Sequence, residues 1–203
     1  MKTCTRSALG LYLQMKQLYI IAGCNGAGKT TASYAIFPQV LHCNEFVNAD
    51  EIARGLSPFH PEGVSIMAGK LMLYRIEELL EKEASFAIET TLASKSYRQL
   101  VQKAQNKGYH VSIIFFWLPT PEQAISRVAQ RVKEGGHDVP RNVIRRRYFA
   151  GIKNLFNIYM PIVDYWMIID NGHTPCDKVA TGGKLAPVQV FDDVNFDNIK
   201  KYV

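Results

Sequence analysis

The sequence contains no apolar run long enough to cross a membrane, no closely spaced pair of cysteines and no compositionally biased tract. A membrane-spanning helix needs about 20 mostly apolar residues, so no membrane-embedded segment is expected. The four cysteines, Cys4, Cys24, Cys43 and Cys176, have no C-x-x-C spacing, which excludes the paired-cysteine motifs that hold metals and leaves the thiols unpaired. What remains is the ordinary composition of a soluble globular protein.

The first fourteen residues also lack the features of a secretory signal. Their apolar patch, Ala8 to Leu13, is shorter than a usual signal core, and no small-residue cleavage site precedes the first predicted strand. Residues 1–15 are therefore expected to be a loose tail, with Met1 or Met15 as the start of the protein. Residues 16–203 are long enough for one domain with a sizeable core.

Apolar, β-rich runs alternate along the chain with segments of helical periodicity. This alternation predicts an α/β fold of the P-loop type, with a five-stranded parallel sheet, helices on both faces and a small C-terminal hairpin. The predicted strands are 18–22, 46–49, 86–88, 111–117 and 165–169; the predicted helices are 31–37, 62–82, 94–106, 121–132 and 141–159; the hairpin strands are 178–180 and 187–191.

One stretch, GCNGAGKT from Gly23 to Thr30, fits the phosphate-binding pattern G-x-x-x-x-G-K-[ST]. It stands between a predicted strand and a predicted helix, which is the order that the pattern requires. Glycines let the backbone approach a ligand, and the N–H groups at the start of the helix attract phosphate. Lys29 is expected to reach the β- and γ-phosphates, and the hydroxyl of Thr30 is expected to hold Mg²⁺.

The sequence therefore predicts a site for ATP with Mg²⁺. A glycine-rich turn with a surface lysine is the alternative, and the flanking strand and helix disfavour it. The residues expected to bind ATP are Gly23, Asn25, Gly26, Ala27, Gly28, Lys29, Thr30 and Thr31.

Two acidic residues follow predicted strands. Asp50 comes after the second strand and Glu89 ends the third, so both are expected at the carboxyl edge of the sheet, beside the phosphate loop. Asp50 is a candidate base for an acceptor hydroxyl, and the alternative is that it caps the next helical turn. Glu89 is a candidate to orient the acceptor or to organise Mg²⁺ through water, and the alternative is a solvated strand end. Thr90 is a weaker candidate, because threonines here also suit a turn.

The net charge of +6 is concentrated between residues 121 and 153, which hold eight basic and three acidic side chains. Arg127 and Arg131 are four residues apart on one predicted helix, and Arg141 and Arg145 are four apart on the next. Gly135 and Gly136 lie between the two pairs. This spacing predicts an arginine-rich lid at about 121–153 that closes on the γ-phosphate, with a solvated basic face as the alternative.

A further carboxylate, Asp170, follows an apolar run as a Walker B aspartate does. The sequence Asp170-Asn171-Gly172 is also a turn signal, and the turn is the favoured interpretation.

Together these motifs resemble the zeta-toxin family of P-loop kinases over residues 16–171. The residues that carry the resemblance are the phosphate loop, Asn48-Ala49-Asp50, Glu89-Thr90-Thr91, Arg131, the segment 135–141 and Arg145-Arg146. The resemblance implies an ATP-dependent kinase that phosphorylates the 3′-hydroxyl of UDP-N-acetylglucosamine. It also implies Asp50 as base, Glu89 as a contact to the acceptor sugar, and Arg131, Arg141 and Arg145 as candidates to contact the ATP phosphates.

The predicted function is thus phosphoryl transfer from ATP to an anionic small acceptor, with an antitoxin as a candidate protein partner. An enzyme of this kind with unpaired thiols is expected in the reducing cytoplasm. A nucleic-acid-stimulated ATPase that uses the basic helix is the alternative function. Such an ATPase needs a Walker B strand, for which Asp170 is a weak substitute. A nucleotide-binding module that only contacts a partner is a third option.

Overall fold

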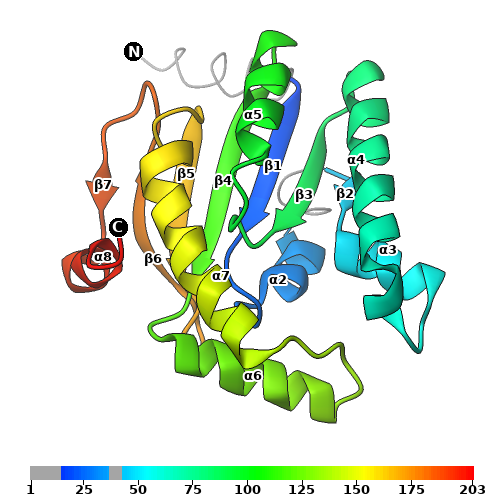
Figure 1. The fold of residues 1–203 in the computed structure, drawn as a ribbon. Helices are drawn as coiled ribbons and strands as arrows, with labels where there is room; N and C mark the ends of the chain where they lie inside the picture. The colour runs from blue at the N-terminus through cyan, green and yellow to red at the C-terminus, as the bar shows by residue number, and fades with distance from the viewer. Residues whose placement is uncertain (1–14, 37–42) are drawn as a thin grey trace.

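The computed structural model describes residues 15–36 and 43–203, so the expected tail lies outside them except for Met15. One mixed sheet runs through the described residues in the order β2-β3-β1-β4-β5-β6-β7 (Figure 1). In chain order, the strands are β1 Gln17–Ala22, β2 Phe46–Val47, β3 Phe86–Thr90, β4 His110–Trp117, β5 Tyr165–Asp170, β6 Asp177–Gly182 and β7 Gln189–Val190.

Strands β1 to β5 are parallel, which confirms the predicted parallel sheet. β1 lies between β3 and β4, β2 pairs with β3, and β5 pairs with β4. The sheet has seven strands rather than five, because β6 pairs antiparallel with β5 and β7 antiparallel with β6. The connection between β5 and β6, residues 171–176, is too short for a crossover, so the predicted hairpin extends the main sheet instead of standing apart.

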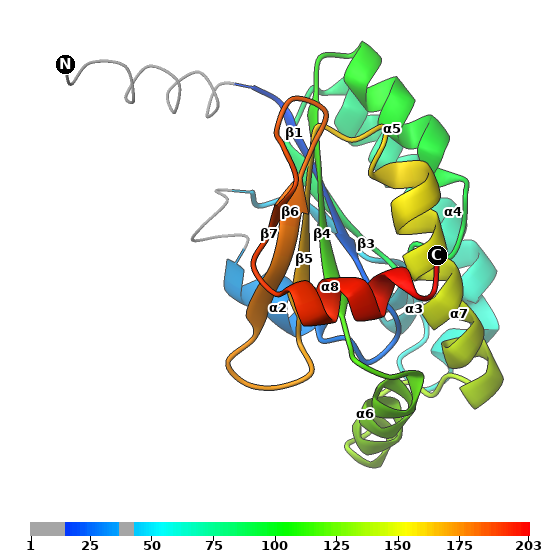
Figure 2. The same cartoon turned by 90° about the vertical axis from the view of Figure 1, so that its left-hand side faces the viewer.

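Helices lie on both faces of this sheet. In Figure 2, α4, α5 and α7 lie on one side and α2 lies on the other. The helices are α2 Lys29–Ile36, α3 Ala49–Leu56, α4 Ser65–Glu81, α5 Tyr97–Asn106, α6 Pro121–Lys133, α7 Arg141–Asn154 and α8 Asp193–Lys200. Two of the predicted helices are divided: a 3₁₀ turn, η1 Pro61–Val64, precedes α4, and α7 continues as a π-helical turn, η2 Leu155–Tyr159.

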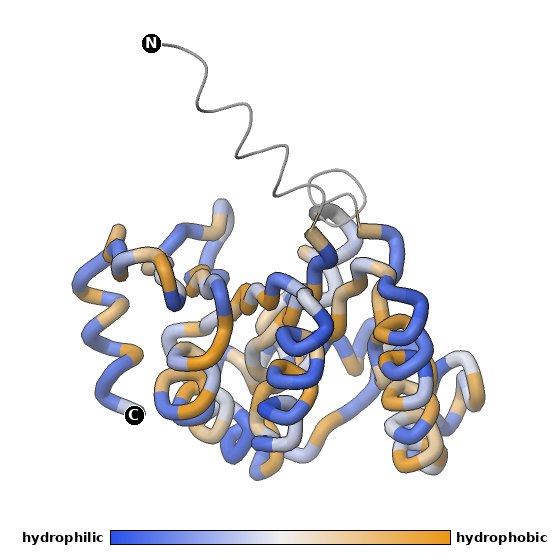
Figure 3. The backbone as a smooth tube through the Cα atoms, turned by 90° about the horizontal axis from the view of Figure 1, so that it is seen from above, coloured by the Kyte–Doolittle hydropathy of each residue, from blue (hydrophilic) through white to orange (hydrophobic). Residues whose placement is uncertain are grey.

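The core forms where the central strands meet the helices. Leu18, Ile20, Phe86 and Ile88 have no exposed surface, because helices cover the central strands of the parallel sheet. Each such side chain contributes about 1.5–3 kcal/mol relative to an exposed one. The helices carry hydrophilic residues among hydrophobic ones, as expected where one face packs on the core (Figure 3).

The chain ends on helix α8, for which the sequence shows no clear apolar stripe, since Ile199 is its one buried residue. Phe196 packs against Phe156 of η2, with ring centroids 6.0 Å apart. Tyr202 packs edge-on against Tyr148 of α7. The C-terminal segment therefore packs against α7 and η2. In the described ranges, 15–36 and 43–203, no helix is both long and apolar enough to cross a membrane.

Candidate active site

The phosphate loop connects β1 to α2 at the carboxyl edge of the sheet. Gly26 has φ +80°, and a Cβ there would lie 2.7 Å from the carbonyl oxygen of Ala124 in α6. Gly28 also has φ +80°, and the side chain of Asn171 covers it while donating a hydrogen bond of 2.8 Å to the carbonyl of Ala27. Larger residues would therefore push α6 and the 171 turn away from the loop.

Cys24 holds the loop in shape through its backbone. Its carbonyl accepts a hydrogen bond of 3.2 Å from the N–H of Ala27 and one of 2.9 Å from Nζ of Lys29. The thiol is buried, and burial raises the pKa of Cys24 to about 11, with Lys29 and Arg127 opposing the rise. The Cys24 thiol thus stays neutral and fills space in the loop.

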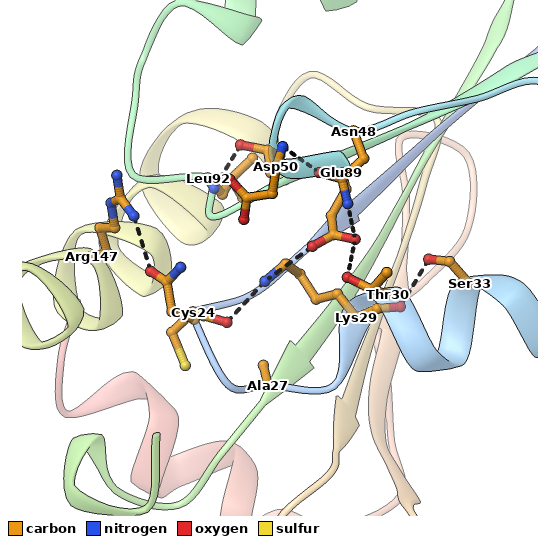
Figure 4. Close-up of polar contacts among 12 residues, drawn as sticks. Cys24, Ala27, Lys29, Thr30, Ser33, Asn48, Asp50, Glu89, Leu92 and Arg147 are labelled. Carbon is orange, nitrogen blue, oxygen red and sulfur yellow. Dashed lines mark hydrogen bonds and ion pairs between the residues drawn. The ribbon is translucent and has the colours of Figure 1, made fainter. Parts of the chain in front are cut away.

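Glu89 at the end of β3 is the centre of a polar cluster (Figure 4). Its Oε2 accepts hydrogen bonds of 2.8 Å from the hydroxyl of Thr30 and 2.9 Å from Nδ2 of Asn48. Its Oε1 lies 3.6 Å from Nζ of Lys29, and these two side chains are 9% and 7% exposed. The lysine and the glutamate therefore neutralise each other at the mouth of the phosphate loop.

Asp50 lies in the first turn of α3. The cap of that helix is Asn48, whose Oδ1 accepts a hydrogen bond of 2.8 Å from the N–H of Asp50, so the alternative of Asp50 as cap is wrong. Within the described part of the chain, no hydrogen bond to the Asp50 carboxylate is formed. The side chain is exposed and is left available to a ligand.

A cavity of about 210 Å³ joins these groups. Its lining includes Asn25, Lys29, Asp50, Glu89, Tyr97 and Arg147. The structure thus brings together the predicted lysine and both predicted carboxylates, beside the side chain of Asn25. The oxygens of Thr30 and Glu89 are hard donors of the kind that Mg²⁺ prefers, and they lie next to each other where phosphates of a nucleotide would approach Lys29.

Arg147 is the charged residue of this cavity that the sequence does not single out. Its Nη1 donates a hydrogen bond of 3.2 Å to Oδ1 of Asn25. Burial lowers the pKa of Arg147, and the negative charge of Asp50 opposes that change. Three consecutive arginines concealed which one faces inward. The spacing of Arg147, Gly151 and Asn154 could have identified the inward-facing arginine. It places a cation, a small residue and an amide on one face of α7.

That face of α7 is packed on the segment after β3. A Cβ on Gly151 would lie 2.6 Å from the carbonyl oxygen of Thr91. Nδ2 of Asn154 donates a buried hydrogen bond of 2.9 Å to the carbonyl of Leu92, whose backbone has φ +58°. The position of Arg147 is therefore fixed relative to Glu89 by the packing of two chain segments.

The other predicted arginines are distributed between two places. Arg131 lines a small cleft with Thr30 and Asp50, and its Nη2 donates a hydrogen bond of 2.7 Å to the carbonyl of His137. Arg141 and Arg145 line a separate cavity of about 700 Å³ between α6 and α7. Nη2 of Arg145 contacts Oε1 of Glu122 there at 2.5 Å. Of these three arginines, only Arg131 lies in a cleft with Asp50 in this arrangement.

The remaining candidates have mainly local roles. Oγ1 of Thr90 accepts a hydrogen bond of 3.0 Å from the N–H of Leu92 and also lines the cavity. Thr31 is exposed on α2. Asp170 is buried and its Oδ1 accepts a hydrogen bond of 2.7 Å from the N–H of Gly172, which confirms the predicted turn. No cluster of three metal-binding side chains occurs among residues 15–36 and 43–203.

Comparisons with known proteins agree with this architecture. The family model described as Zeta toxin matches residues 12–159. A protein of Haemophilus influenzae, described as uncharacterized, is 25% identical over 138 residues, which are 68% of this chain and 96% of that protein.

Two solved structures have a similar fold. The AvrRxo1-ORF1:AvrRxo1-ORF2 complex with sulphate ions gives a TM-score of 0.74 at 19% identity, over 96% of this chain and 68% of that one. A structure from the PezAT chromosomal toxin-antitoxin system of Streptococcus pneumoniae gives 0.65 at 17% identity, over 96% and 87%.

The family match includes the phosphate loop, Asp50, Glu89 and Arg147, which are the residues that the structure gathers around one cavity. The enzyme class is that of an ATP-dependent phosphotransferase, and the chain belongs to the Zeta toxin family.

Proposed function

We propose that this protein transfers the γ-phosphate of ATP to a hydroxyl group of a nucleotide sugar, with UDP-N-acetylglucosamine as the first candidate. The observation that carries the proposal is the position of the Asp50 carboxylate. It lines the same cavity as Lys29 and Arg147, and no described residue donates a hydrogen bond to its oxygens. A carboxylate held open beside two cations suits the deprotonation of a neutral hydroxyl.

The transfer step follows from this geometry. Asp50 accepts the proton of the acceptor hydroxyl as that oxygen bonds to the γ-phosphorus, and the bond from the γ-phosphorus to the bridging oxygen of ADP breaks. Lys29 and Arg147 stabilise the negative charge on the transferring group. Thr30 and Glu89 would hold Mg²⁺, which supplies further positive charge to the phosphates.

Glu89 and Thr90 are proposed to form the acceptor side of the cavity. Glu89 already makes contacts with Lys29, Thr30 and Asn48, so it orders the phosphate loop as well as bordering the acceptor space. Tyr97, in the same lining, offers an aromatic face to the acceptor. This combination of amide, carboxylate and aromatic groups fits a polar, ring-containing molecule such as a nucleotide sugar.

We also propose that the lid is smaller than the sequence suggests. Gly151 and Asn154 attach α7 to the segment after β3, whereas Arg131 is attached to the connection between α6 and α7 through the carbonyl of His137. Arg131 would therefore move with residues 121–140, and α7 would stay in place. In this arrangement Arg141 and Arg145 reach the phosphates only if α7 also moves.

Two cellular features complete the proposal. Two structural neighbours are described as a toxin-antitoxin system and as a two-protein complex, which supports an antitoxin-like protein partner for this chain. If such a partner restrains the kinase, bacteria that express the wild type alone should grow more slowly than bacteria that express Lys29→Ala.

The second feature is the compartment. Cys24, Cys43 and Cys176 are unpaired, which suits the cytoplasm, where ATP is available.

The central test is mass spectrometry of UDP-N-acetylglucosamine after incubation with the protein and Mg·ATP. We expect the mass of one added phosphate, and no addition with Lys29→Ala. Absence of product from wild-type protein that binds ATP would overturn the choice of acceptor. Other nucleotide sugars would then be tested, followed by DNA and RNA as stimulators of ATP hydrolysis.

A further inference from the structure

Asn48 connects the two carboxylates of the candidate site. It follows the last residue of β2, next to β3, and the residue is 6% exposed. Its Nδ2 donates to Oε2 of Glu89 at 2.9 Å, and its Oδ1 accepts from the backbone N–H of Asp50 at 2.8 Å (Figure 4). One amide group thus spans the ends of two neighbouring strands.

This arrangement requires a side chain that donates at one end and accepts at the other. Aspartate accepts but cannot donate, and it would place a negative charge against Glu89. Serine accepts as a helix cap but is too short to reach across to the next strand. An amide also adds no third negative charge beside the two carboxylates.

Resting on the phosphoryl transfer proposed above, we propose that Asn48 is a positioning residue for that reaction. It holds the Glu89 carboxylate against Thr30 and Lys29, and it fixes the first turn of α3 so that the Asp50 carboxylate remains open to the acceptor. The proton acceptor and the phosphate loop are thereby set at a constant spacing through one side chain.

The charged groups that face Glu89 come from three helices. Lys29 belongs to α2, Asp50 to α3 and Arg147 to α7, and all of them line the same cavity. A second carboxylate at position 48 would offset the charge of the two cations, whereas a neutral residue would leave the charge balance unchanged.

A purely structural role predicts a different result. Asn, Asp and Ser are all good helix caps, so Asn48→Asp and Asn48→Ser both keep the cap of α3 and should unfold at nearly the same temperature as the wild type. Only the link to Glu89 is lost. Asn106→Asp, at the exposed end of α5, is the matched control for the added charge.

The experiment measures thermal unfolding, Mg·ATP affinity and turnover for the four proteins. We expect turnover to fall about tenfold in Asn48→Ser and further in Asn48→Asp, with Asn106→Asp unchanged. Mg·ATP affinity should also fall in both Asn48 variants at an unchanged unfolding temperature, because Glu89 is no longer held against Thr30 and Lys29. Turnover and Mg·ATP affinity equal to those of the wild type in both variants, or losses that match the unfolded fraction, would overturn the proposal.

The result is separable from the choice of acceptor. If the wild type phosphorylates no nucleotide sugar, turnover is measured as phosphate release from Mg·ATP with water as acceptor. Mg·ATP affinity needs no acceptor at all, so a loss of affinity in both Asn48 variants at an unchanged unfolding temperature supports the positioning role even then. Unchanged affinity together with unchanged phosphate release contradicts it.

Discussion

The guanidinium of Arg147 donates a hydrogen bond to the side-chain carbonyl of Asn25, across 122 positions of the chain. This contact ties α7 to the phosphate loop, and it places a cation at the cavity that also contains Asp50 and Lys29. Because the arginine is half-buried, its charge acts in a medium less polar than water.

We therefore expect Arg147→Ala to lower turnover about 10²–10³-fold, the usual effect of removing one group that stabilises transition-state charge. Arg146→Ala is the matched control, because its side chain is exposed on the same helix. Steady-state kinetics measures the turnover of both variants for comparison. Equal rates for both would show that the inward-facing arginine has no part in transfer.

Asp50→Asn should reduce transfer about 10²–10⁴-fold while changing ATP affinity by no more than about twofold. The amide keeps the shape of the side chain but accepts no proton, and the cap of α3 comes from Asn48 and is retained. Rapid-quench assays of transfer and calorimetric titration with ATP give the two quantities. Full turnover in this variant would rule out Asp50 as the base.

Gly151→Ala should destabilise the protein by about 1–3 kcal/mol, because the new methyl group would lie 2.6 Å from the carbonyl oxygen of Thr91. Gly69→Ala in α4 is the control: nothing lies within 4 Å of the added carbon, and alanine favours a helix by up to about 1 kcal/mol over glycine. Chemical denaturation should show opposite shifts of the midpoint for the two variants. A neutral Gly151→Ala would mean that α7 moves away from Thr91 at little cost.

The thiols should differ in reactivity. Burial raises the pKa of Cys24 to about 11, and Cys43 is also buried with a raised pKa, whereas Cys176 is exposed. At about pH 8 iodoacetamide should therefore label Cys176 and leave Cys24 and Cys43 unlabelled, as measured by peptide mass spectrometry.

The same shift has a consequence for stability. Because the folded-state pKa of Cys24 lies above its unfolded value, burial of the neutral thiol stabilises the fold fully below about pH 8.5, and this contribution falls as the pH rises toward 11. Cys24→Ala should remove that part of the alkaline loss. Rapid labelling of Cys24 in the native protein would contradict the burial of the loop.

Much of this site was predictable because it follows from local rules. The phosphate loop is a contiguous pattern, and Asp50 and Glu89 are found at the ends of strands that a parallel sheet must align. The structure overturns only the alternative role of Asp50, because Asn48 supplies the cap of α3.

What the sequence did not reveal depends on contacts between distant segments. The inward direction of Arg147 depends on how α7 packs against the residues after β3. A run of three arginines does not indicate which of them lies on the inner face of the helix. The pairing of Arg145 with Glu122 depends on how α6 and α7 cross. The hairpin joins the main sheet because the connection after β5 is short, and α8 has too few buried residues to leave a periodic pattern.

The attachment of α7 to the segment after β3 has a consequence for synthesis of the chain. A nascent polypeptide that has already produced the phosphate loop, Asp50 and Glu89 still lacks Arg147, and it still lacks Asn154 to hold the Leu92 carbonyl. Nucleotide-binding groups are therefore made long before the cation that completes the cavity. During translation, competence for transfer should arrive late and abruptly, when most of the molecule has left the ribosome.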